Sequence, residues 1–99
     1  MKFGQIVEAL RDGMHRAARA GWNGKDMWIY VEQGKTIPYD SLREPQKSWL
    51  GDDMRILPHF NIRNAKGRIV VGWVASQEDI LAEDWELLDP VEYRDSLDM

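Results

Sequence analysis

The chain has 99 residues, no cysteine, two histidines and a formal net charge of −4. A chain of this length forms one small domain, which buries only about two thirds of the surface that its unfolded form exposes. The lack of cysteine excludes a disulfide framework and a thiolate zinc site, and two histidines are too few for a histidine-based metal cage. We therefore expect neither a metal site nor a cofactor.

Charge is unevenly distributed along the chain. Residues 1–75 carry 12 basic and 8 acidic side chains, whereas residues 76–99 carry 1 and 9. Domains that bind nucleic acid polymers are usually strongly basic, so this balance argues against DNA or RNA but leaves room for a small anion. No segment has the apolar length of a membrane span, and Glu8 interrupts the apolar stretch that a signal peptide would need. We expect a cytoplasmic protein with no membrane partner.

The first predicted element is a short amphipathic helix that ends near Gly13. Apolar side chains recur at i, i+3, i+4 and i+7, namely Phe3, Ile6, Val7 and Leu10. Residues 14–19 depart from this period, and residues 27–31 are rich in aromatic and β-branched side chains. Both segments are therefore predicted to be strands.

Between these strands lies the sequence Arg-Ala-Gly-Trp-Asn-Gly-Lys, residues 19–25. Gly21 and Gly24 can adopt positive φ, Asn23 tolerates the left-handed region, and successive N–H groups in such a turn can bind an anion. The alternative is a plain tight turn with Trp22 tucked into the core. If the turn binds a flat anionic ligand, the candidate residues are Arg19, Trp22, Asn23, Gly24 and Lys25.

Residues 33–57 are predicted to form a long loop, with one helical turn at most. Glycine and proline recur through this segment, and no periodicity is sustained. Loops of this length are uncommon inside a compact domain and are often functional or mobile.

The last third of the chain has clearer patterns. Apolar Phe60 and Ile62 alternate with polar Asn61 and Arg63, and an Asn-Ala-Lys-Gly turn then precedes residues 68–74. This pattern predicts a β-hairpin. Ser76 and Asp79 form a capping box that should begin a short helix over residues 77–82. Residues 85–88 are expected to be a final strand, and residues 89–99 form an acidic tail.

The predicted fold class is α+β, with a small antiparallel sheet, an N-terminal helix and a second short helix on one face. Residues 1–88 form the single domain. A domain this small cannot easily enclose a nucleotide-sized cavity, and pockets of several hundred cubic ångströms usually lie between elements or subunits. We therefore expect a homo-oligomer.

Five tryptophans are many for a chain of this size. Trp28 and Trp85 lie in strand-like runs and are expected to pack in the core. Trp22 and Trp73 adjoin glycine or small residues, so one ring face of each could remain accessible. Trp49 is expected to pack in the loop or to anchor an interface.

Two further groups of polar residues are candidates for acid–base catalysis and for phosphate binding. Asp79 and Glu83 are four residues apart and could act as an acid–base pair, but carboxylates at a helix start are usually caps and no partnered nucleophile is present. We expect no enzyme. The basic residues that could converge on phosphates are Arg16, Arg19, Lys25, Arg63 and Arg68.

Several motifs occur in an order that resembles the Thoeris anti-defence 2 family of small phage proteins, over roughly residues 3–88. These motifs are Phe3-Gly4 with Ala9-Leu10 and Gly13, residues 19–25, Pro58-His59, Trp73-Val-Ala-Ser-Gln77, Asp79, and Leu81-Ala-Glu-Asp-Trp85. The segment 35–57 matches the family pattern least, and the acidic tail after Leu88 looks like an addition.

The resemblance implies a non-enzymatic sponge that holds cyclic ADP-ribose isomers made by bacterial TIR-domain enzymes and so blocks the host effector. It also implies a homotetramer with signal sites between subunits, and separate sites for cyclic dinucleotides, which would extend its action to CBASS immunity. The residues placed in or near the signal pocket are Trp22, Asn23, Gly24, Trp73, Ala75, Ser76 and Asp79. The alternatives are a hydrolase of such signals and a tryptophan-anchored protein-interaction module.

Overall fold

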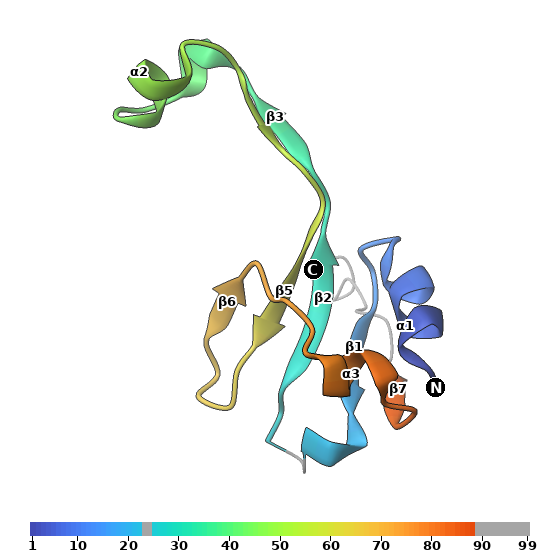
Figure 1. The fold of residues 1–99 in the computed structure, drawn as a ribbon. Helices are drawn as coiled ribbons and strands as arrows, with labels where there is room; N and C mark the ends of the chain where they lie inside the picture. The colour runs from blue at the N-terminus through green and yellow to red at the C-terminus, as the bar shows by residue number, and fades with distance from the viewer. Residues whose placement is uncertain (23–24, 89–99) are drawn as a thin grey trace, which may run out of the picture.

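A five-stranded antiparallel sheet forms the body of the protein (Figure 1). We analysed a computed structural model that describes residues 1–22 and 25–88. The strand order is β6-β5-β2-β1-β7. The bounds of these strands are β1 (Arg16–Arg19), β2 (Trp28–Glu32), β5 (His59–Arg63), β6 (Ile69–Val71) and β7 (Trp85–Leu88). The predicted α+β class, the strands and the β5–β6 hairpin are confirmed.

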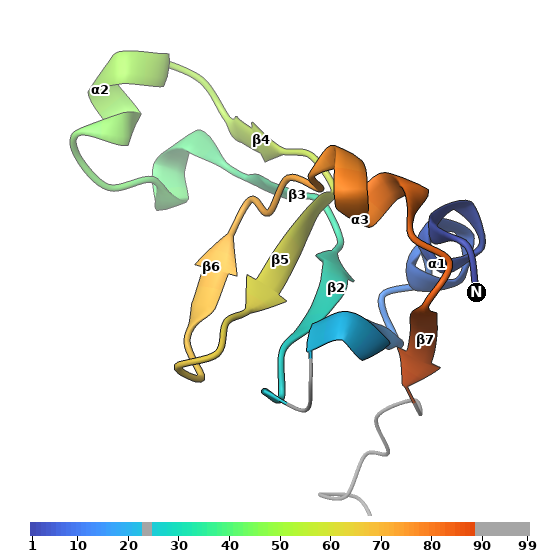
Figure 2. The ribbon, with the colours of Figure 1, turned by 60° about the horizontal axis from the view of Figure 1, so that its bottom comes forward.

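Helices α1 (Phe3–Leu10) and α3 (Gln77–Leu81) contact each other beside strands β1 and β7 (Figure 2). The apolar stripe of α1 is buried as predicted, and Ile6 and Leu10 have no exposed surface. They pack with side chains from one face of the sheet, including Ile29 and Trp85. None of the helices among residues 1–22 and 25–88 is long and apolar enough to cross a membrane.

The start of α3 is fixed by the predicted capping box. The Asp79 N–H donates to Ser76 Oγ at 3.1 Å, and the Ser76 N–H donates to Asp79 Oδ2 at 3.2 Å. The two bonds satisfy backbone donors that have no partner within the helix. The helix ends at Leu81, one residue earlier than predicted.

Residues 33–57 form an arm that projects from the body, and the prediction of a long loop is wrong (Figure 1). Strands β3 (Lys35–Ile37) and β4 (Met54–Ile56) pair in a second, two-stranded sheet. The end of the arm carries a 3₁₀ turn, η2 (Tyr39–Ser41), and the short helix α2 (Gln46–Leu50), which agrees with the one helical turn expected there.

The arm continues the central strand pair β2–β5 after a short interruption. The last pair in that ladder is Glu32 with His59, and the arm ladder begins at Lys35 with Ile56. At the joint, a Cβ atom on Gly34 would lie only 2.5 Å from the Ile56 carbonyl oxygen. Glycine is therefore required by close approach of the two backbones.

The two faces of the main sheet differ sharply. Ile29 and Val31 of β2 point into the core under the helices, so Trp28 and Tyr30 point to the opposite face. Trp28 is half-buried there, and the Arg16 guanidinium lies 5.1 Å from the centre of its ring. The prediction that Trp28 packs in the core is wrong, because the alternation of β2 assigns the core positions to its aliphatic residues.

Candidate functional site

The glycine-containing turn begins with a 3₁₀ turn, η1 (Ala20–Trp22). Asn23 and Gly24, which were predicted to bind ligand, lie outside the described residues. Gly21 lies within η1 and does not use the left-handed region that a glycine can adopt, whereas Asp26 has a positive φ of 57°. A Cβ atom on Gly21 would lie 3.2 Å from Asp84 Oδ2, so the close approach of a carboxylate explains this glycine.

That carboxylate binds the start of the turn. The Gly21 N–H donates to Asp84 Oδ2 at 3.0 Å, and the Ala20 N–H donates to the Asp84 carbonyl oxygen at 3.1 Å. A residue more than 60 positions away in the sequence therefore takes the N–H groups of Ala20 and Gly21.

Arg19 joins the two motifs that the sequence singled out. Its Nε donates to Asp84 Oδ1 at 2.9 Å, and its Nη1 donates to Asp79 Oδ1 at 3.0 Å. The Arg19 side chain is only 14% exposed. The segment before Trp22 and the segment after Trp73 are thus tied together within one chain, and the guanidinium is neutralised by two carboxylates.

The ionisation of these groups reflects this pairing. Hydrogen bonding from Arg19 lowers the pKa of Asp84. Burial acts to raise the pKa of Asp79, but hydrogen bonds from Arg19 and Ser76 outweigh it and hold that pKa below its usual value. Both carboxylates raise the pKa of Arg19, with Asp84 contributing more. The cluster is therefore fully ionised near neutral pH.

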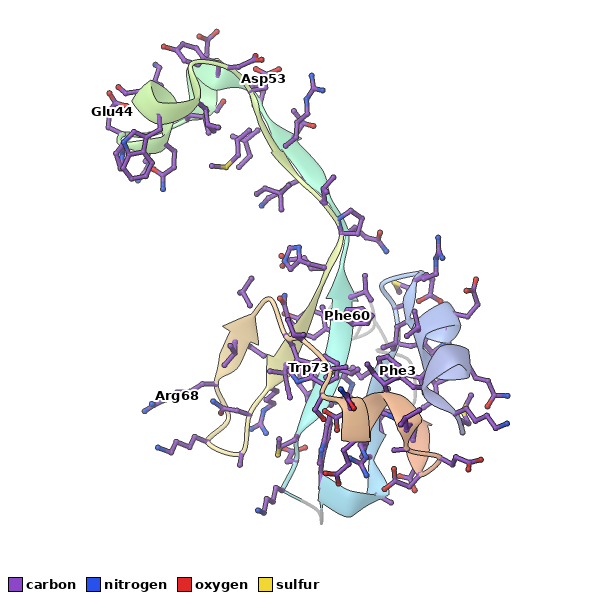
Figure 3. The ribbon with its side chains drawn as sticks, in the orientation of Figure 1. Phe3, Glu44, Asp53, Phe60, Arg68 and Trp73 are labelled. Atoms are coloured by element: carbon purple, nitrogen blue, oxygen red, sulfur yellow. The ribbon has the colours of Figure 1, made fainter. Side chains whose placement is uncertain are left out.

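A group of aromatic rings lies under the same junction, with Trp85 at its centre. The Trp85 ring is 5.4 Å from that of Trp22 and 6.4 Å from that of Trp73, both in edge contacts. Trp85 is 1% exposed, and its Nε1 donates to the Asp79 carbonyl oxygen at 2.8 Å. Figure 3 shows Trp73 beside Phe3 and Phe60.

These contacts show how far each tryptophan packs in the core and how far it stays accessible. Trp85 packs in the core as predicted, while Trp22 and Trp73 are half-buried against it. Each of these two rings therefore packs partly against the core and keeps part of its surface exposed. Both halves of the predicted site rest on the same buried ring.

A pocket of about 380 Å³ lies beside the turn. Three of the predicted residues line it, namely Arg19, Trp22 and Lys25. Trp73, Ala75, Ser76 and Asp79 do not line it. The predicted composite pocket is therefore not closed within one chain, although its two halves are held together by Arg19.

A second hollow, of about 320 Å³, lies between α1 and the base of the arm. Its walls include Val7, Arg11, His59 and Phe60. His59 is held on its strand by the Glu32 carboxylate at 2.9 Å and the Leu57 carbonyl oxygen at 2.8 Å, as a hydrogen-bonding residue rather than a free base. None of the predicted ligand-binding residues that the structure describes borders this hollow.

The five basic residues considered for phosphate binding do not converge on one point. Arg63 binds the Asp26 carboxylate at 3.0 Å, and Arg68 lies on the β5–β6 hairpin, away from the turn (Figure 3). Within the described part of the chain, Arg16 and Lys25 make no ion pair. The free positive charge near the turn therefore belongs to Arg16 and Lys25 rather than to Arg19.

Asp79 has no carboxylate oxygen free for proton transfer. Oδ1 accepts from Arg19, and Oδ2 accepts from both the Ser76 N–H and its hydroxyl group. The pair with Glu83 is therefore poorly suited to acid–base chemistry. No group of three or more potential metal ligands was found among residues 1–22 and 25–88.

Two features of the site were missed from the sequence. Asp84 was noted only as part of the Leu81-Ala-Glu-Asp-Trp85 motif, but it holds Arg19 and Gly21. Trp28 was assigned to the core, but it lines the pocket beside the turn. The alternation of Trp28 and Tyr30 with aliphatic residues was the signal that could have placed it on the other face.

The fold and the joined motifs define a small α+β domain in which residues 19–22 and 73–85 meet around one tryptophan. The chain belongs to the Thoeris anti-defense 2-like domain family, whose model matches residues 1–88. It is 34% identical over 91 residues to Thoeris anti-defense 2 of Bacillus phage SP01, an alignment that spans 89% of this chain and 94% of that protein. The family that the motifs resembled is confirmed.

Proposed function

We propose that this chain is an anti-defence protein that binds and sequesters a cyclic ADP-ribose isomer without degrading it, and so keeps the host Thoeris effector inactive. Membership of the Thoeris anti-defense 2-like family supports the anti-defence role. The observation that carries the sequestration proposal is the Arg19 junction, which fixes Trp22 and Trp73 around one buried ring.

Affinity sets how many contacts the site must supply. A useful sponge needs roughly nanomolar binding, which corresponds to about −12 kcal/mol. Each stack of a base on tryptophan contributes about 1 to 3 kcal/mol, so two stacks are insufficient. Charge-assisted hydrogen bonds of about 1.5 to 3 kcal/mol each must supply much of the rest. Because Arg19 is already neutralised and the Ser76 hydroxyl donates to Asp79, this task falls first to Lys25 and Asn23.

The proposal includes a cytoplasmic homotetramer with signal sites between subunits. The residues of the second motif, including Ser76, do not line the pocket beside Trp22 in the same chain. A second copy could bring its own second motif to that pocket and complete it. Separate sites for cyclic dinucleotides, and hence an effect on CBASS immunity, form part of the same proposal.

A capture and release experiment tests the function. The full chain, at micromolar concentration, is incubated with 1″-3′ glycocyclic ADP-ribose, free ligand is removed by filtration, and the protein is heated. The expected result is depletion of the compound from the filtrate and its release with unchanged mass. No depletion would contradict sequestration of this compound, and a product of different mass that accumulates beyond one equivalent would favour a hydrolase.

The same experiment separates the proposal from a protein-interaction module. Trp22→Ala and Trp73→Ala should weaken binding of the compound at least tenfold while the variants stay folded, so capture is compared at a protein concentration near the wild-type Kd. Trp49→Ala is the matched control, because Trp49 lies on the arm and is 76% exposed. If the chain captures no nucleotide and the first two variants only alter its oligomeric state, the interaction module is the better description.

A further inference from the structure

The pocket beside the turn is a hollow in the face of the sheet that the helices leave uncovered. Ala18 of β1 lines its floor, opposite Glu86 of β7 in the strand register. The pairing of Ala17 with Ile29 places Trp28 of β2 on the other side of Ala18. The Ala18 side chain is a single methyl group, so a space opens between Trp28 and Glu86. Ala20, Trp22, Lys25 and Asp26 line it as well.

The walls of this hollow combine aromatic rings with both signs of charge. Trp22 and Trp28 both line it, together with the exposed side chains of Lys25 and Glu86. Arg16 lies two residues from Ala18 on the same strand face, with its guanidinium over Trp28. Its Nε is buried and has no hydrogen-bond partner within the described part of the chain. Lys25, which makes no ion pair within the described residues, lines the hollow, and the unpartnered Arg16 donor lies on the same strand face as its Ala18 floor; both suit an anionic ligand.

We propose that this hollow binds one adenine nucleotide unit, with Trp28 as a stacking wall that complements Trp22. Lys25 and Arg16 contact the phosphate, and Glu86 accepts a hydrogen bond from the exocyclic amino group of the base or from a ribose hydroxyl. This inference rests on the proposed function, because it names the part of the signal that the turn holds.

Size supports a single nucleotide unit rather than a whole cyclic signal. Ligand pockets usually measure about 300 to 1,000 Å³, and this hollow, at about 380 Å³, is near the lower limit. The remainder of a cyclic ADP-ribose isomer would extend out of the hollow. The second motif of another copy could then contact it.

Calorimetry with small probes tests the assignment on the full chain. AMP should bind more tightly than either adenosine, which lacks the phosphate, or ribose 5-phosphate, which lacks the base. Trp28→Ala should weaken AMP binding at least tenfold, while Trp28→Phe should restore most of it because a ring remains. Ala18→Leu should abolish binding by filling the hollow.

Matched variants separate the hollow from general effects on the protein. Trp49→Ala removes an exposed tryptophan from the arm, and Val71→Leu enlarges an exposed side chain on the same sheet face but on the far strand, β6. Both should bind AMP like the wild type. If a variant unfolds, AMP-induced NMR shifts of the Ala18 and Glu86 amides and of the Trp28 indole in the wild-type chain provide the test.

The outcomes distinguish this inference from the proposed function. If 1″-3′ glycocyclic ADP-ribose is captured equally by the wild type, Trp28→Ala and Ala18→Leu, the hollow is not the site, and the sponge proposal stands. If AMP binding depends on Ala18 and Trp28 but the cyclic compound is not captured, the hollow stands and the sponge proposal fails for that compound. If the wild type binds neither, both are overturned.

Discussion

The two faces of the main sheet use tryptophan in different ways. On the face under α1 and α3, Trp85 is buried and its indole N–H is bonded to the Asp79 carbonyl oxygen. On the uncovered face, Trp28 is half-buried and contacts the Arg16 guanidinium. The same residue type thus contributes to stability on one face and presents a ring to solvent on the other. Arg19, at the end of β1, and Trp22, in the turn that follows it, connect the two.

The largest expected effect is that of Trp85→Ala on the covered face, which tests whether the tryptophan on this face contributes more to stability. Removing a fully buried tryptophan leaves a cavity and should lower the free energy of unfolding by about 3 to 5 kcal/mol. Urea unfolding followed by circular dichroism measures this loss. A loss no larger than that of Trp28→Ala would mean that the two faces do not differ as described.

Arg19→Met tests the junction between the faces. It removes hydrogen bonds to two carboxylates and should lower the free energy of unfolding by about 2 kcal/mol near neutral pH. Arg19 holds the pKa values of Asp79 and Asp84 below their usual range in the folded state. This stabilisation is therefore fully present above the unfolded pKa values, near about pH 4, and is lost as pH falls through the lower folded values.

Unfolding measured as a function of pH checks the sign of this effect. The wild type should lose stability as the solution is acidified below about pH 4, and Arg19→Met should lose less over the same interval. Glu8 pairs only loosely with the exposed Arg11, at 3.9 Å, so Arg11→Met is a suitable control. Equal pH dependence in all three proteins would show that the junction does not carry the stabilisation.

Trp22→Ala tests the role of the turn that follows β1, between the two faces. Loss of one stacking face should weaken binding of 1″-3′ glycocyclic ADP-ribose at least tenfold, which is about 1.4 kcal/mol. Isothermal titration calorimetry measures it, and a thermal melt shows that the variant remains folded. Unchanged affinity would remove Trp22 from the site.

The smallest predicted effect concerns the start of α3. Ser76→Ala removes the side-chain acceptor of the capping box and should cost about 1 kcal/mol of stability. Ser76→Thr keeps a hydroxyl that can accept from the Asp79 N–H and donate to its carboxylate, and should recover most of the loss in chemical denaturation. Two variants of equal stability would mean that the cap contributes nothing beyond the Arg19–Asp79 bond.

Elements with local signals were predictable from the sequence. The helical stripe of α1 and the capping box of α3 depend on residues within one or two turns of each other. The β5–β6 turn was also visible, and its first residue, Asn64, accepts hydrogen bonds from the N–H groups of Lys66 and Arg68. In each case, the responsible contact spans only a few positions in the sequence.

The features that were missed depend on contacts across the fold. Strands β3 and β4 have three residues each, too few to show a period, and they pair only because they extend β2 and β5. The role of Gly21 depends on a carboxylate 63 positions away. Trp28 was misassigned because aromatic residues suit either face of a strand, and only the packing of helices decides which face is covered.

The joint between body and arm makes the arm an exchangeable part of the protein. Glu32 and His59 face each other in the last pair of the β2–β5 ladder, so a short turn between them could close the hairpin without changing the register of the main sheet. The tie between Arg19 and Asp79 and the ring of Trp85 lie elsewhere in the body. A change in the length or sequence of the arm would therefore leave the geometry of the body unaltered.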